Sequence, residues 1–549
     1  MPLPLIFYRT GTSEFLDISV AAPSFDLFNP TSDCYLAVLL PHGEASVASV
    51  IRLAPQQRVT VQRPVSPGDQ SDQAIRPAGI PDRRLPCMVV PVTSHGDRYR
   101  AYCDDEISQR VPVDAGLVAA MHTRAESILN ESRELVTDLA MPAGTLIYTP
   151  GPFYRAAGLF ARDLLYQLEG SGREFGAAAE IKAAVDFLAL KQLRQNTRIG
   201  AYTYPCGAIP DHVYPDGRYC WGPGAFYGDD TAHFHRASMD ASMCFITLGW
   251  HYGYKSGWDD SWKGWFASLA PQFAEAWHSV PRNPVTGLVT QWTTAGHIGA
   301  SGIAETHDAG VMWGFHDSYG FGGDDVGVSV LACNAARALA DMHEHAGHAA
   351  ASSEWDATAG AMRDAIRAQF DPSGTLPWGV GPHAPALASP DITAYAAWSG
   401  ILTPAQADAA SDWFAARYHA DRAAGGAADL FHMAPGYRGA VRMARKADDV
   451  SPGRHVWPDM ERPHWENLTY GYNAYQDGGY WYTLSHCVAT TLFRCHPLEA
   501  LTWVHECYTD IISGGDDHPY ERIDGYLPVN NRYNASVGPV LGMAVSAQQ

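Results

Sequence analysis

The sequence predicts a mainly α-helical fold, an (α/α)6 barrel or toroid, preceded by an N-terminal β-sandwich-like domain. Two observations predict this fold. Residues 1–115 alternate short β-branched or apolar runs with turn-forming residues, whereas apolar residues recur at helical spacing throughout 116–549. At 549 residues the chain also exceeds the length that one hydrophobic core usually supports. We therefore expect a β-rich domain over 1–115 and a helical barrel over 116–549.

The strands of the first domain are expected in short runs bounded by proline, glycine, aspartate or asparagine. Such boundaries are typical of strands joined by turns. A polar, proline-rich segment at 65–84 is expected to be an exposed loop inside this domain. The four clearest runs are "CYLAVLL" (34–40), "ASVIRLA" (48–54), "RVTVQRPV" (58–65) and "CMVVPVTS" (87–94).

The helices are expected where apolar residues recur at i, i+3, i+4 and i+7, often in alanine-rich segments. Alternate helices are joined by long aromatic and glycine-rich loops, which in a compact domain are usually functional. This alternation of helix and elaborate loop favours the toroid over a simple bundle. The periodic segments are 115–140, 175–196, 261–280, 324–347, 352–370, 403–421 and 497–515. The long loops are expected at 199–232, 283–323, 372–402, 428–482 and 513–536.

The charge balance excludes some partners. The chain has 38 basic and 59 acidic residues, a net charge of −21. Nucleic acid and anionic lipid both need a basic surface, so neither is expected to bind. Aromatic residues make up 11% of the chain, including 16 Trp and 27 Tyr. Their rings suit the apolar faces of a neutral sugar, and they also fill helical cores.

No targeting, membrane or metal signal is found. The N-terminus lacks a basic region followed by an apolar one, and no run of about 20 apolar residues occurs, so a cytoplasmic protein is expected. The ten cysteines form no C-x-x-C pair, which argues against a zinc cage and favours reduced thiols. His233 and His235 follow two aspartates, but helix packing is a commoner reason for this spacing than metal binding. We expect neither a metal ion nor a cofactor, and the sequence does not indicate the oligomeric state.

Four motifs occur in an order that resembles the six-hairpin glycosidases, the superfamily of trehalases, α-glucosidase I, glucoamylases and bacterial α-L-rhamnosidases. The resemblance covers roughly residues 140–549. It implies an (α/α)6 barrel in which loops at one end build the substrate pocket. The motifs are an Arg-Asp pair before "YQLEG" (166–170), "NPVTGLV" (283–289) with "WGFHDS" (313–318), "YQDGGYW" (475–481) and "HPYERIDG" (518–525).

The resemblance implies that Asp317 is a general acid and Glu521 a general base. An inverting glycosidase needs two such carboxyl groups, about 6.5–9.5 Å apart, one protonated and one ionised. Trp313, Phe315 and Tyr319 would exclude water from Asp317 and raise its pKa, as an acid requires. An arginine next to Glu521 would keep that carboxylate ionised.

Other carboxylates compete for these roles. Glu305 or Asp308 could replace Asp317, and Glu466 could replace Glu521. The trehalase-type string Ser-Gly-Trp-Asp occurs at 256–259, but Asp259 opens an amphipathic helix and is expected to be its N-cap. Asp324 and Asp325, which precede an alanine-rich helix, are likewise expected to be caps.

Substrate contacts are expected from the same loops. A carboxylate such as that of Asp230 suits vicinal hydroxyl groups, although it could instead cap a helix. Arg162 is expected in a structural ion pair, but would select a uronic acid if it reached the pocket. The expected binding residues are Asp230, Trp313, Phe315, His316, Tyr475, Asp477, Tyr480, Trp481 and Arg162.

The leading hypothesis is therefore an inverting, exo-acting glycoside hydrolase on a small glycoside or oligosaccharide. The alternative is a lyase on a uronate-containing glycan, in which Tyr475, Tyr480 or His486 would abstract a proton. A non-catalytic carbohydrate-binding protein is the third possibility.

Overall fold

The computed structural model describes the strands within residues 2–103 by their backbone and most of the helical part in full. Described beyond the strands are residues 115–152, 158–170, 176–199, 202–220, 239–290, 323–381, 388–423, 482–513, 522–524, 527–529 and 532.

The strands within residues 2–103 pair in antiparallel fashion. Strand β4 lies between β5 and β7, and β8 extends this sheet, while β1 pairs with β2 and β3 with β6. Strand β1 also approaches β7 and β8, and β2 approaches β3, so the sheets lie against one another. The four predicted runs are β4, β5, β6 and β7, and these predictions are confirmed. The strands are β1 (Pro2–Arg9), β2 (Thr12–Ser19), β3 (Ser24–Phe28), β4 (Cys34–Leu39), β5 (Ser49–Leu53), β6 (Arg58–Gln62), β7 (Cys87–Val92) and β8 (Tyr102–Cys103).

Among the described residues, five helices are buried on almost every side. Every residue of α9 and α12 is buried, and α5 is buried from Met239 to Gly253. A helix buried all round must lie inside a larger helical assembly. These inner helices are α3 (Ala161–Gly170), α5 (Met239–Ser256), α7 (Val326–His345), α9 (Pro390–Trp398) and α12 (Ser485–Phe493).

Six further described helices form an outer layer. The outer helix α8 buries Ala359, Met362 and Ile366, a single stripe at helical spacing, and exposes its other faces. The outer helices are α2 (Ala115–Glu131), α4 (Ala178–Lys191), α6 (Asp260–His278), α8 (Ala349–Arg367), α10 (Pro404–Ala423) and α13 (Pro497–Ser513).

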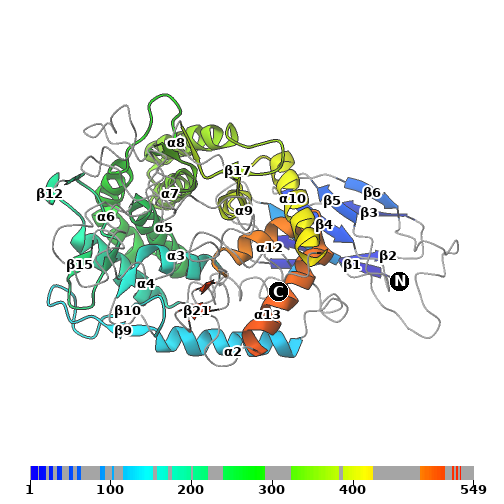
Figure 1. Cartoon of the computed structure of the whole chain (residues 1–549), viewed down its shortest axis with the longest axis horizontal. Helices are drawn as coiled ribbons and strands as arrows, with labels where there is room; N and C mark the ends of the chain where they lie inside the picture. The colour runs from blue at the N-terminus through cyan, green and yellow to red at the C-terminus, as the bar shows by residue number, and fades with distance from the viewer. Residues whose placement is uncertain are drawn as a thin grey trace, which may run out of the picture.

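The inner helices form a ring. They touch in the order α3, α5, α7, α9 and α12, and α12 also contacts α3. Outer helices bridge consecutive inner ones: α6 contacts α5 and α7, and α10 contacts α9 and α12. Figure 1 shows these helices grouped together, with the N-terminal strands beyond α10. Because the chain alternates between the layers, the inner helices start at the same end of the toroid, and the predicted mainly α, toroidal fold is confirmed.

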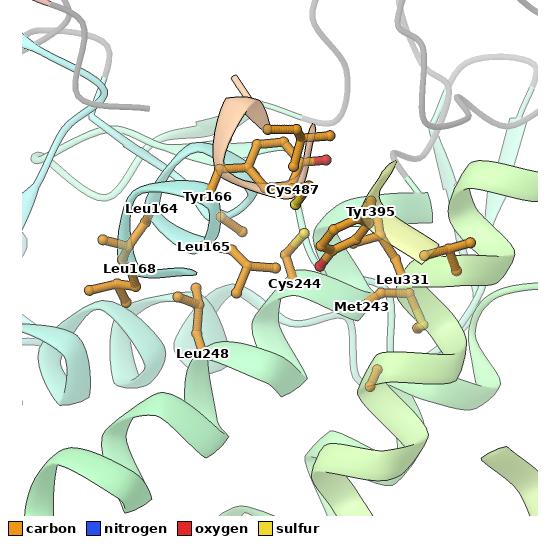
Figure 2. Packing of buried hydrophobic residues seen from close by; sticks show 14 of the residues in the cluster. Leu164, Leu165, Tyr166, Leu168, Met243, Cys244, Leu248, Leu331, Tyr395 and Cys487 are labelled. Atoms are coloured by element: carbon orange, nitrogen blue, oxygen red, sulfur yellow. The ribbon is translucent and has the colours of Figure 1, made fainter. Parts of the chain in front are cut away.

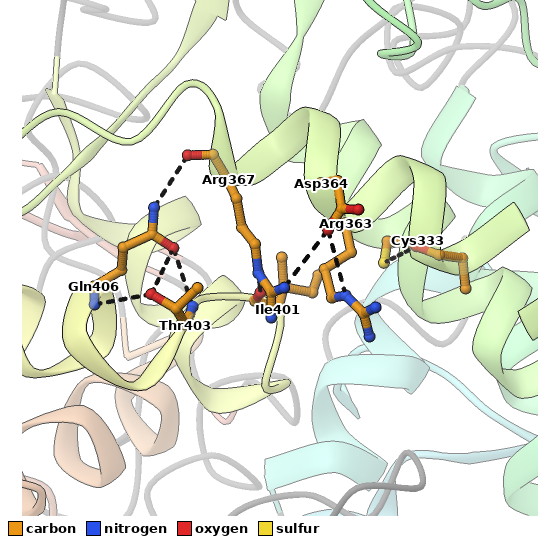
Figure 3. A network of polar contacts seen from close by, with 8 residues as sticks. Cys333, Arg363, Asp364, Arg367, Ile401, Thr403 and Gln406 are labelled. Atoms are coloured by element: carbon orange, nitrogen blue, oxygen red, sulfur yellow. Dashed lines mark hydrogen bonds and ion pairs between the residues drawn. The ribbon is translucent and has the colours of Figure 1, made fainter. Parts of the chain in front are cut away.

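A polar network fixes outer helix α10 beside α8. Thr403 and Gln406 form a capping box, in which the Thr403 Oγ1 accepts from the Gln406 backbone N–H at 3.2 Å and the Gln406 Oε1 accepts from the Thr403 N–H at 3.0 Å. The Gln406 amide also donates to the Arg367 carbonyl at 3.0 Å, and Arg367 Nε donates to the Ile401 carbonyl at 2.6 Å (Figure 3). The start of α10 is therefore attached to the end of α8.

Two predicted boundaries are wrong. The expected loop 372–402 contains the inner helix α9, together with β17 (Leu376–Pro377), β18 (Gly379–Val380) and β19 (Ala388–Ser389). Helix α9 has no polar stripe because it is buried all round, so it lacks the amphipathic pattern that identifies a surface helix.

The expected helix over 115–140 ends early, at Glu131. Strand β9 (Arg133–Leu135) follows it and pairs with β10 (Leu146–Tyr148). The Ser132 hydroxyl donates to the Ile128 carbonyl at 2.6 Å, which occupies a carbonyl of the last helical turn.

Three observations complete the description. No described helix has the length and apolar character needed to cross a membrane. Of the six cysteines whose side chains the structure describes, four are buried. Helix α2 begins at Ala115, where the sequence places the change from strands to helices, and the division into two domains stays a prediction.

Candidate active site at the N-terminal ends of the inner helices

Three of the described inner helices, α5, α7 and α12, follow segments that contain predicted site residues. Segment 221–238 leads into α5, 291–322 into α7 and 424–481 towards α12. The described starts of α5, α7 and α12 lie at one end of the toroid. Lying outside the described residues are Asp230, Trp313, Phe315, His316, Asp317, Tyr475, Asp477, Tyr480, Trp481 and Glu521, together with the alternatives Glu305, Asp308 and Glu466.

Arg162 is the only predicted site residue that the structure describes, and it pairs with Asp240. Its Nη1 lies 2.7 Å from the Asp240 Oδ2. Arg162 is the second residue of α3 and Asp240 the second residue of α5, so the ion pair joins the first turns of two adjacent inner helices. The side chain of Asp240 is only 2% exposed, against 19% for Arg162. The expected structural ion pair is present.

A small three-stranded sheet lies directly before α3. Strand β11 (Leu159–Phe160), directly before α3, pairs with β14 (His212–Val213), which pairs with β15 (Tyr219–Cys220). The chain then continues from β15 into segment 221–238. Gly158, before β11, has φ +85°, and a Cβ there would lie 2.1 Å from the Val213 carbonyl oxygen. This close approach requires glycine.

A group of polar and sulfur side chains lies where four inner helices meet. Figure 2 shows Tyr166, Cys244, Tyr395 and Cys487 gathered between α3, α5, α9 and α12. The Tyr395 hydroxyl donates to the Glu169 Oε1 at 3.1 Å, and both residues are buried. Burial raises the pKa of Tyr166 and of Cys244 well above their ordinary values, so both stay protonated near neutral pH.

The Tyr166 hydroxyl is buried and meets no hydrogen-bond partner in the described part of the chain. The hydroxyls of Thr483 and Ser485, at the start of α12, are likewise buried and without a partner there. Such groups are rare, since a buried polar atom usually has a protein or water partner. They are hydrogen-bonding groups available on the inner helices.

The segment that contains Asp317 has its two ends held together. Asp324 accepts from the Asn283 Nδ2 at 3.0 Å to each carboxylate oxygen, and from the Thr286 Oγ1 at 2.6 Å. Asn283 and Thr286 belong to "NPVTGLV", which precedes the segment, and Asp324 follows it. Asp324 is 3% exposed, so a buried carboxylate with three hydrogen bonds closes the base of segment 291–322.

Backbone hydrogen bonds reinforce this closure. The Asp325 N–H donates to the Val289 carbonyl at 2.8 Å, and the Val289 N–H donates to the Ser329 hydroxyl at 2.9 Å. The Thr290 hydroxyl donates to the Gly323 carbonyl at 3.3 Å. Residues 289–290, before segment 291–322, therefore lie next to residues 323–325, after it.

The expected capping roles are confirmed for two aspartates and wrong for a third. Asp325 caps α7 by accepting from the Val328 N–H at 2.9 Å, and Asp259 caps α6 by accepting from the Trp262 N–H at 2.7 Å. Asp324 is not a cap, because its carboxylate accepts hydrogen bonds from Asn283 and Thr286, which precede segment 291–322. It also lies in β16 (Asp324–Asp325), which precedes α7 and pairs with β18 of the connection between α8 and α9.

His486, a proposed base of the lyase alternative, is packed inside the inner ring. It is 4% exposed and lies edge-on to Trp398, with ring centroids 4.8 Å apart. Its Nε2 lies 3.3 Å from the Cys487 Sγ. The His486 ring is therefore packed against protein side chains in a position that does not suit a proton acceptor for substrate.

The described residues contain no group of three or more His, Cys, Asp or Glu side chains that could hold a metal ion.

Sequence reasoning missed several polar residues of this region. Asp240 and Glu169 had a signal, because each is an acidic residue in a helix that is otherwise apolar around it. Asn283 and Thr286 were part of a recognised motif, but their partner Asp324 is distant in sequence and required the fold.

No family model and no curated protein matches the chain. Similar solved structures include a rhamnosidase from Klebsiella oxytoca with rhamnose bound, at 11% identity and TM-score 0.46, with 98% of this chain and 94% of that chain covered. Another is a mannosylglycerate hydrolase from Thermus thermophilus in complex with glucose, at 13% identity and TM-score 0.45, with 77% and 100% covered. A wild-type glycosidase has 15% identity and TM-score 0.46, with 79% and 98% covered.

Proposed function

We propose that this chain is a glycoside hydrolase that releases a terminal sugar from a glycoside or oligosaccharide with inversion of configuration. Asp317 is the general acid and Glu521 the general base. The observation that carries the proposal is the closure of segment 291–322 by Asp324 at the start of an inner helix. This closure holds together the two ends of the segment that contains Asp317, directly before α7.

The chemistry needs two carboxyl groups on opposite sides of one sugar ring. Asp317 would protonate the leaving oxygen while Glu521 removes a proton from the attacking water. Room for that water requires a separation of about 6.5–9.5 Å. The two residues belong to segments far apart in the sequence, and a ring of parallel inner helices is a fold that brings such segments to one end.

The inner helices supply groups that suit sugar hydroxyls. Tyr166, Thr483 and Ser485 have buried hydroxyls without a partner in the described residues. A sugar hydroxyl or an ordered water near these groups would satisfy them, since buried polar groups are costly when unpaired.

A neutral sugar fits the charge distribution better than a uronate. Arg162 is paired with the buried carboxylate of Asp240, so its charge is largely offset within the protein. The net charge of −21 also repels an anionic glycan. The packed position of His486 gives the lyase alternative no support.

The test uses purified Asp317→Asn and Glu521→Gln with aryl glycosides of several sugars, each with a good and a poor leaving group. A good leaving group departs without protonation, so loss of the acid matters most for the poor one. Asp317→Asn should reduce kcat about 100-fold or more on the poor leaving group and much less on the good one. Glu521→Gln should reduce kcat equally on both.

The matched control is Asp259→Asn, which changes a carboxylate that caps an outer helix. It should keep wild-type kcat on every substrate. Full activity of both Asp317→Asn and Glu521→Gln on a substrate that the wild type hydrolyses would show that other carboxylates perform the reaction.

A further inference from the structure

The connection between α7 and α8 has a fixed backbone. Gly347 has φ +81°, its N–H donates to the Glu344 carbonyl at 2.9 Å, and the His348 N–H donates to the His343 carbonyl at 2.8 Å. This pair of hydrogen bonds is the Schellman motif that ends many helices. The motif brings the side chains at positions 343 and 348 together, where an apolar contact is usual.

In this chain both positions are histidines, and their rings lie close together, tilted by 48°. The two Nδ1 atoms are 3.3 Å apart and the ring centroids 5.5 Å. His343 also packs edge-on against Phe266 of α6, with centroids 5.1 Å apart, which fixes its ring. His348 precedes α8 and is exposed, so the pair is accessible from solvent.

We propose that His343 and His348 form a two-histidine binding site for a divalent transition metal ion, with zinc as the best match. Zinc–imidazole bonds are about 2.0–2.1 Å long, so two nitrogens of a tetrahedral site are about 3.3–3.4 Å apart. The observed distance of 3.3 Å between the two Nδ1 atoms matches this nitrogen–nitrogen distance. Without metal, one ring must donate its Nδ1 proton to the other, and binding of the ion replaces that proton.

The remaining coordination positions are filled by water. The described residues provide no third metal ligand near the pair, since they contain no group of three metal-binding side chains. The C-terminus of α7 and the N-terminus of α8 meet here, so their opposite dipoles offset each other and the affinity comes from the imidazoles. The site is independent of the proposed hydrolase activity, because it lies at the opposite end of α7 from Asp324.

A bound ion would tie α7 to α8. These two helices form one of the inner–outer hairpins of the toroid, and the unfolded chain does not hold the two rings together. An ion that binds only the folded state stabilises it by RT ln(1 + c/Kd), where c is the free ion concentration, so the thermal midpoint should rise with the logarithm of the ion concentration above Kd.

The experiment is a titration of the full-length, EDTA-treated protein with Zn²⁺ in a calorimeter, for wild type, His343→Ala and His348→Ala. The control is His345→Ala, in the same turn but stacked on Trp258 with centroids 4.1 Å apart. Circular dichroism verifies that each variant is folded. Wild type and His345→Ala should bind one more equivalent than His343→Ala and His348→Ala.

A second readout uses Cu²⁺, whose electron paramagnetic resonance spectrum counts coordinated nitrogens. Wild type should show two imidazole nitrogens at the site, and neither alanine variant at 343 or 348 should. If either variant binds as many Zn²⁺ equivalents as the wild type, or if the wild type binds none, the proposal is wrong.

Discussion

The Arg162 Nη1 lies 2.7 Å from the Asp240 Oδ2, and this contact joins the first turns of inner helices α3 and α5. Asp240 is almost completely buried, so its charge depends on this guanidinium. The two residues fix the relative position of two inner helices at their first turns.

Loss of Arg162 should therefore destabilise the protein. Arg162→Met leaves a buried carboxylate without its cation and should lower the free energy of unfolding by about 3 kcal/mol or more. The double variant Arg162→Met/Asp240→Leu should recover part of the loss, because no unpaired charge remains. Urea unfolding of both single variants and the double variant gives the coupling, and independent, additive effects would contradict the account.

The Asp324 carboxylate should matter for both stability and activity. In Asp324→Asn one oxygen becomes an amide donor facing Asn283 and Thr286, so hydrogen bonds are lost in a buried place at a cost of about 2 kcal/mol. Hydrolysis should fall at least about tenfold because a misplacement of about 1 Å at the acid is costly. Asp260→Asn is the control, since that side chain is 97% exposed, and it should change neither quantity. Equal activity of the two variants would show that Asp324 does not support hydrolysis.

Two glycines with the same backbone angle should respond differently to alanine. Gly144 and Gly158 both have φ +85°, but a Cβ at Gly144 meets no atom within 4 Å, whereas one at Gly158 would lie 2.1 Å from the Val213 carbonyl oxygen. Gly144→Ala should cost about 1–2 kcal/mol from the backbone angle alone. Gly158→Ala adds a clash between β11 and β14 and should cost about 2 kcal/mol more. Similar thermal midpoints for the two variants would mean that the close approach is not rigid.

The Asp138–Lys191 ion pair predicts a pH dependence. The Lys191 ammonium donates to the Asp138 carboxylate at 2.6 Å and, with the Ala140 N–H, lowers the pKa of Asp138. A lowered pKa in the folded state adds stability that is present above the unfolded pKa of about 3.9 and is lost as pH falls below it.

Asp138→Asn should therefore be less stable than wild type at pH 7, and the difference should shrink as pH falls below about 4. Lys191→Met removes the main cause of the lowered pKa and should have the same pH dependence. Urea midpoints between pH 7 and pH 2.5 measure both, and a difference that is constant over this range would contradict the assignment.

The sequence predicts the layers of this fold well because most of its helices are amphipathic or alanine-rich. It fails for α9, since a short helix buried on every side has no polar stripe. It also extends the helix of residues 115–140 past Ser132, where a side-chain hydrogen bond to the backbone and strand pairing prevail over helix propensity. Both errors come from tertiary contacts that local periodicity does not contain.

The candidate site is predicted less completely, for a related reason. The ion-pair role of Arg162 and the caps at Asp259 and Asp325 depend on neighbours close in sequence or on general helix chemistry, and these predictions are confirmed. The role of Asp324 depends on Asn283, forty-one positions earlier, and no local pattern indicates that contact. The roles of Asp317 and Glu521 stay predictions.

Inversion by Asp317 and Glu521 would fix the anomeric form of the first product, so that form is the decisive measurement. Proton NMR during the first turnovers of an aryl glycoside records the anomer before mutarotation. We expect release of the anomer opposite to that of the substrate, and a rate at least about 100-fold lower for Asp317→Asn on a poor leaving group. Release of the same anomer as the substrate, or an unsaturated product, would contradict it.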